Sequence, residues 1–157
     1  MNNWIVTLSI SFLVLFTGAI TARGDTKLSN IFEIHSWDEA PYLELENGVK
    51  YSNAKLLKTY NGELQGKGQL TYLMSYNESG HAYFTGVEHF EGSVAGRKGQ
   101  LSIAHEGTFV DGVVESRFRI IDGSQQQELV GLIGDGSYTT GHSMQVNYEF
   151  SFSKAEK

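Results

Sequence analysis

The feature that most constrains this chain is an alternation of apolar and polar residues, which recurs from about residue 31 to near the C-terminal end. Between Leu64 and Tyr76, alternate positions carry leucine, glycine, tyrosine and methionine, whereas the positions between them are mostly glutamine, lysine, threonine and serine. Successive side chains of a β-strand point to opposite faces, so this pattern predicts a strand with one buried and one solvated face. No segment shows the 3.6-residue period of an amphipathic helix.

The same alternation predicts further strands, joined by short turn sequences. We expect them at residues 31–37, 42–46, 53–60, 82–94, 101–109, 114–120 and 144–152, with a shorter one at 128–133. Turns are predicted at 77–80, 96–99, 111–112 and 122–124 from their glycine, asparagine and aspartate residues. The glycine-rich stretch 131–136 is interpreted as a loop, because no helix follows it to supply a phosphate-binding N-terminus.

About eight half-buried strands joined by short turns must bury a common face, either between two sheets or inside a closed barrel. Consecutive hairpins favour the barrel, because closure removes unpaired strand edges. Glycines within the expected strands mark the bends that a coiled barrel needs. We therefore predict an all-β fold, a single antiparallel up-and-down β-barrel of about eight strands, preceded by a signal peptide helix.

The N-terminal segment has the composition of a secretory signal. Thirteen mostly apolar residues at 4–16 are too few to span a bilayer, and small residues follow as far as Ala22. We expect a signal peptide at 1–22, a linker at 23–30, the barrel domain at 31–153 and a tail at 154–157. Cleavage near Ala22 would leave no stable membrane anchor and an exported protein, periplasmic or secreted.

Composition excludes several functions. A net charge of −6 without a basic run argues against nucleic-acid binding. The absence of cysteine excludes disulfides, thiol catalysis and cysteine-ligated zinc. The five histidines show no metal-binding spacing, so we expect neither a metal nor another cofactor.

Two polar residues fall on the face that should be buried. Glu88 shares its parity with Phe84 and Phe90, and His105 shares its parity with Leu101 and Ile103. The hairpin permits two registers. If position 96 pairs with 99, the two residues are diagonal to each other, and if 94 pairs with 99, they are directly opposite. In either register we predict that both side chains lie inside the barrel and within reach of each other.

Three interpretations of this pair remain open. It could be a mutually satisfied buried pair that only fixes the register. It could form the polar end of a ligand pocket, or act in general acid–base catalysis if a cavity and shifted pKa values accompany it. The candidate ligand-binding residues are Tyr72, Phe84, Glu88, His105, Ser116, Phe118 and Tyr148; no catalytic residue is assigned.

A set of weak motifs gives the chain a family resemblance. The motifs are Phe32…Trp37-Asp38-Glu39, Tyr60-Asn61-Gly62-Glu63-Leu64, Phe84-Thr85-Gly86-Val87-Glu88, His105-Glu106-Gly107 and Gly123-Ser124…Glu128-Leu129. Together they resemble the bacterial domain-of-unknown-function family 3224, over about residues 31–152. The resemblance implies an allene oxide cyclase-like β-barrel and transfers no catalytic residue. Gln125–Gln127 and the signal peptide depart from the usual pattern of the family.

The leading hypothesis is an exported barrel that binds a small, mostly apolar ligand in its interior. It requires a cavity lined by Tyr72, Phe84, Glu88, His105 and Phe118. The alternatives are a cofactor-independent cyclase- or isomerase-like enzyme, and a structural barrel with a filled core that forms homo-oligomers.

Overall fold

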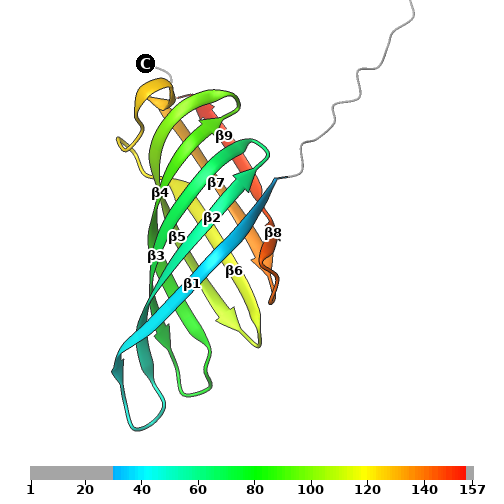
Figure 1. Cartoon of the computed structure of the whole chain (residues 1–157). Helices are drawn as coiled ribbons and strands as arrows, with labels where there is room; N and C mark the ends of the chain where they lie inside the picture. The colour runs from blue at the N-terminus through cyan, green and yellow to red at the C-terminus, as the bar shows by residue number, and fades with distance from the viewer. Residues whose placement is uncertain (1–29, 155–157) are drawn as a thin grey trace, which may run out of the picture.

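The computed structural model describes residues 30–154, and within them the chain forms nine strands and one short 3-10 helix (Figure 1). The elements are β1 (Ile31–Glu44), β2 (Lys50–Asn61), β3 (Leu64–Tyr76), β4 (Ala82–Val94), β5 (Arg97–Val110), β6 (Val113–Ile120), η1 (Gln127–Leu129), β7 (Leu132–Thr140), β8 (Gln145–Asn147) and β9 (Glu149–Lys154). The predicted signal peptide, most of the linker and the end of the tail lie outside the described residues. Residues 30–154 include no helix with the length and apolar character needed to cross a membrane.

The strands form one antiparallel sheet that curls into an up-and-down barrel, as the alternation predicted. The order in the sheet is β8-β1-β2-β3-β4-β5-β6-β7-β9, so chain neighbours are also sheet neighbours from β1 to β7. β8 pairs with β1, β9 pairs with β7, and these two short strands are consecutive in the chain. The segment 145–154 therefore changes partner at Tyr148, whose N–H donates to the carbonyl of Asn30 at 3.0 Å, and this joins the two ends of the sheet.

Three local predictions were wrong. β1 is one strand from Ile31 to Glu44 rather than two, and it accommodates Pro41 beside an irregularity in its register with β2. Residues 128–133 do not form a separate strand, because 128–129 belong to η1, 130–131 are a turn and 132–133 begin β7. The glycine-rich stretch 131–136 is mostly the first half of β7. Gly136 sits beneath the ring of Phe118, where a Cβ atom would collide with it, so glycine here permits close packing rather than a loop.

The interior of the barrel is divided into two apolar clusters. The first lies toward the end covered by η1, where Leu129 is fully buried, and it includes Leu64, Phe90, Leu101 and Ile103. The second lies toward the other end, which carries the turns at 45–49, 77–81 and 111–112 (Figure 1), and it includes Leu56, Tyr72, Met74 and Phe84. We call these the packed half and the open half.

Candidate functional site

A buried carboxylate lies at the boundary between the two halves. Glu88 is fully buried, and its Oε2 atom accepts three hydrogen bonds: from Lys58 Nζ at 2.9 Å, His105 Nε2 at 2.7 Å and Tyr60 OH at 3.0 Å. The lysine is as deeply buried as its partner, with 1% of its side chain exposed. Its ammonium group also lies 4.6 Å from the ring centre of Phe32 and 4.9 Å from that of Tyr60, positions that suit a cation–π contact. We call these four residues the charge layer: Lys58, Tyr60, Glu88 and His105.

Strand geometry brings the charge layer together. Lys58 and Tyr60 alternate inward on β2, Glu88 does so on β4, and His105 does so on β5. Between β2 and β4, strand β3 places Gly68 beside the carboxylate, where a Cβ atom would overlap with Glu88 Oε1. A side chain at this point would therefore displace the carboxylate from its present position. That second oxygen is buried, and it has no hydrogen-bond partner among the described residues.

The predicted contact between Glu88 and His105 is confirmed, but neither predicted register is correct. Val94 pairs with Arg97, so Glu88 lies opposite Ile103 and diagonal to His105. The turn consists of Ala95 and Gly96, with φ angles of 47° and 81°. This is the pattern of a type I′ turn, which favours asparagine or glycine at its first central position, so an alanine there hid the true turn in the sequence.

The charge layer keeps its carboxylate ionised and its imidazole neutral. Burial by itself would raise the pKa of Glu88, but Lys58 and the hydrogen bond from His105 lower that pKa to about 2. Burial lowers the pKa of His105, and the nearby Lys58 lowers it further. Because an ionised carboxylate can only accept, Nε2 of the neutral imidazole carries the proton and donates it. Nδ1 is then a buried acceptor, and it has no partner among the described residues.

These properties do not suit acid–base catalysis. A general base works best when its pKa lies near the operating pH and its atoms reach the substrate. Glu88 has a pKa of about 2 and none of its surface is exposed, while His105 is 2% exposed. Glu88 and His105 are buried, and the charge of Glu88 is balanced by Lys58. This geometry supports the interpretation that Glu88 and His105 are a mutually satisfied pair that fixes the strand register.

A cavity of about 320 Å³ occupies the open half. Its walls are mostly apolar, and Lys58 is the member of the charge layer that reaches it. Across the lumen, the hydroxyl groups of Tyr72 on β3 and Tyr138 on β7 are hydrogen-bonded at 3.0 Å. Toward the mouth, Glu39 accepts hydrogen bonds from Ser52, from Tyr76 at 2.8 Å and from Trp37 at 3.2 Å. Burial raises the pKa of Glu39, but these hydrogen bonds outweigh burial and lower the pKa.

The structure places all seven predicted site residues inside the barrel, but it does not bring them into one cavity. Each is at most 5% exposed: Tyr72, Phe84, Glu88, His105, Ser116, Phe118 and Tyr148. Tyr72 and Phe84 line the interior cavity, whereas Glu88, His105 and Phe118 do not. The interior therefore holds a cavity, but three of the five residues expected to line it do not, and Phe118 belongs to the packed half.

Sequence reasoning missed Lys58, which supplies the positive charge that pairs with Glu88. Its position shares the parity of Ala54, Leu56 and Tyr60, all of which are buried. The alternation of apolar residues along 53–60 therefore indicates an inward side chain at this position.

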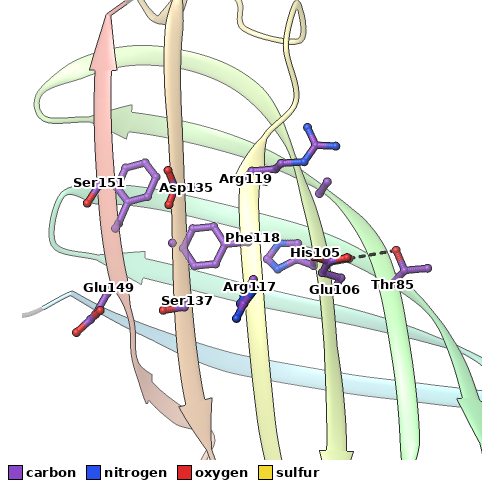
Figure 2. A pocket seen from close by; sticks show the side chains of 13 residues that line it. Thr85, His105, Glu106, Arg117, Phe118, Arg119, Asp135, Ser137, Glu149 and Ser151 are labelled. Carbon is purple, nitrogen blue, oxygen red and sulfur yellow. Dashed lines mark hydrogen bonds between the residues drawn. The ribbon is translucent and has the colours of Figure 1, made fainter.

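A second hollow of about 520 Å³ lies against β5, β6, β7 and β9, and its lining combines outward residues with the buried His105 and Phe118. Figure 2 shows Arg117 and Arg119 on β6, with Glu106 on β5 and Asp135 on β7 beside them. The register places Arg117 opposite Glu106 and Arg119 opposite Asp135, as expected for charges on the wet face. Within residues 30–154, no ion pair of 4.0 Å or less involves either arginine.

Two histidines outside the charge layer make hydrogen bonds at the surface, whereas His142 lines the interior cavity. His81 bonds to Asp111 at 3.0 Å, and His35 bonds to Thr59 at 2.8 Å. The part of the chain that the structure describes holds no group of three or more histidine, aspartate or glutamate side chains placed to bind a metal ion.

Fold and site together define a small antiparallel barrel with one filled half, one hollow half and a buried charge layer between them. The chain belongs to the family described as "Protein of unknown function (DUF3224)", which it matches over residues 28–152. It is similar to the crystal structure of a DUF3224 family protein with unknown function from Shewanella oneidensis MR-1. The two are 26% identical with a TM-score of 0.65, and the match covers 82% of this chain and 99% of the other. No curated protein matches this chain.

Removing the positive charge of Lys58 should destabilise the fold, because the carboxylate of Glu88 stays buried without a partner of opposite charge. We expect Lys58→Met to lower the free energy of unfolding by about 3–5 kcal/mol, because Glu88 is left buried without its counter-charge. The double variant Lys58→Met/Glu88→Gln removes both charges and should recover most of that loss in urea denaturation. Lys55→Met, on the outer face of the same strand, is the matched control and should change stability by less than about 0.5 kcal/mol. A Lys58→Met protein as stable as the wild type would contradict this account.

Low pH should destabilise the barrel by protonating Glu88 and His105. The pKa values of Glu88 and His105 are both lower in the folded protein than their ordinary values of 4.5 and 6.5, so the unfolded chain binds more protons and stability falls as the pH falls. The contribution of His105 to the free energy of unfolding is complete above pH 6.5. The contribution of Glu88 is lost as the pH falls from 4.5 to 2. We expect Glu88→Gln to flatten the dependence of unfolding free energy on pH below 4.5, whereas Glu91→Gln on the outer face keeps the wild-type curve. Identical curves for all three proteins would show that Glu88 is not held ionised.

Proposed function

We propose that this protein binds a small, mostly apolar molecule inside the open half of its barrel. The observation that carries the proposal is the interior cavity of about 320 Å³. Ligand sites are typically concave, about 300–1,000 Å³ in volume and lined mainly by apolar side chains with a few placed polar groups. This cavity fits that description at the small end of the range.

The cavity walls combine hydrophobic surface with polar groups at defined depths. Leu56, Met74, Phe84, Phe109 and Val146 supply apolar wall. Lys58 and the Tyr72–Tyr138 pair lie at the inner end, and Glu39 with Tyr76 lies toward the mouth. Such an arrangement would hold an apolar body by burial and fix its orientation through one polar atom.

The inward-facing residues of the two halves differ in size. Several inward positions of the open half carry small residues, namely Ser52, Ala54, Ala82 and Gly107. The corresponding positions of the packed half carry leucine, isoleucine, valine and phenylalanine. Protein interiors normally pack to high density, so a hollow of this size in an otherwise well-packed barrel favours binding over a purely structural role.

Filling the cavity should abolish binding. Val114 is half-buried and lines the cavity, whereas its neighbour Val113 is 42% exposed on the outer face. We expect the neutral dye Nile red to bind the full-length protein with increased fluorescence, and Val114→Phe to weaken that binding at least about tenfold by occupying its space. Val113→Phe introduces the same ring outside the cavity and should leave the affinity unchanged.

Thermal melts of both variants establish that the fold is retained. Wild-type protein that does not bind the dye, or a Val114→Phe variant that binds it as tightly as Val113→Phe, would contradict the proposed function.

A further inference from the structure

The inner end of the cavity is closed by a bridge between two phenol groups. Tyr72 and Tyr138 project from β3 and β7, which are four strands apart in the sheet and therefore face each other across the lumen. Their hydroxyl groups are 3.0 Å apart, and both residues line the cavity. Two hydroxyl groups carry two protons and four lone pairs, and one hydrogen bond between them uses one of each. The bridge therefore keeps hydrogen-bonding capacity for a third polar atom.

The inner end of the cavity carries no net charge. Lys58 is its cation, and the ammonium group is already paired with Glu88 at 2.9 Å, with both side chains buried. The remaining sides of the ammonium group meet the ring faces of Phe32 and Tyr60. His105, the other titratable member of the charge layer, is neutral because burial lowers its pKa. An ionic ligand head would therefore bring an uncompensated charge into an apolar space, which is costly.

The charge at the mouth disfavours anions as well. Glu39 lines the cavity, and its hydrogen bonds from Ser52, Tyr76 and Trp37 satisfy the ionised form. Lys50, at 3.9 Å, partly balances this carboxylate from a more exposed position. An acid entering the barrel would thus pass a like charge and reach no free cation.

We infer that the ligand is an uncharged oxygen compound, a ketone, aldehyde or alcohol with an apolar body, whose oxygen hydrogen-bonds to the Tyr72–Tyr138 bridge. This inference rests on the proposed function and adds the chemical class of the ligand. The apolar body occupies the space between the bridge and the mouth, against Leu56, Met74 and Phe84.

Displacement of Nile red by compounds of one chain length tests the inference. The competitors are methyl hexyl ketone, the alkene in which a methylene group replaces its oxygen, octanoate and octylamine, all at a pH where the last two are charged. We expect the ketone to bind about three- to tenfold more tightly than the alkene, the range that one neutral hydrogen bond supplies. Octanoate and octylamine should bind at least about tenfold more weakly than the ketone.

The double variant Tyr72→Phe/Tyr138→Phe removes both hydroxyl groups of the bridge, because either one left alone could still donate to a ketone. It should lose the preference for ketone over alkene while it still binds Nile red, and Tyr83→Phe, on the outer face of β4, should keep the preference. Equal binding of ketone and alkene by the wild type, or tighter binding of octanoate or octylamine, would overturn the inference and leave the proposed function standing. Failure of the wild type to bind Nile red would instead overturn the proposed function.

Discussion

An ionised carboxylate buried inside a small barrel is the constraint on which the rest of the structure depends. Glu88 has no access to water, so the protein itself must supply its counter-charge and hydrogen-bond donors. Lys58 and Tyr60 on β2 and His105 on β5 do so from either side of β4, and Gly68 on β3 leaves the necessary space. A shift of any of these strands by one residue would turn its member of the charge layer toward solvent, so the ion pair also specifies the register.

The charge layer separates two different uses of the barrel interior. On the side of η1, large apolar side chains fill the lumen to form a conventional core. On the other side, a hollow lies beside the Tyr72–Tyr138 bridge and reaches residues 141–144, which connect β7 to β8. Under the proposed function, the filled core and the ligand site would thus occupy opposite ends of one sheet. Glu88 is held ionised and does not line the cavity, so among the members of the charge layer it is Lys58 that borders the hollow.

Much of this architecture follows from alternation alone, since a period of two along nearly every segment permits few folds. It also placed Glu88 and His105 inside and close together, which the 2.7 Å hydrogen bond confirms. Other features depended on contacts distant in sequence. β7 has glycine where the rings of Phe118 and Phe150 cover it, so its strand character is visible only once the neighbouring strands are in place. Ala95 adopts a left-handed conformation that glycine normally supplies, which displaced the expected register. The importance of Lys58 follows from its pairing across the barrel, because lysines are mostly found at the surface.

The most direct test of this account is the protonation state of Glu88 itself, measured from the chemical shift of its side-chain carboxyl carbon by nuclear magnetic resonance as the pH is lowered. The account predicts a carboxylate that stays ionised well below pH 4.5, with a pKa of about 2, for as long as the barrel remains folded. A carboxyl group that takes up its proton at pH 4.5 or above in the folded protein would contradict it, because the interior would then hold a neutral acid beside an unpaired lysine.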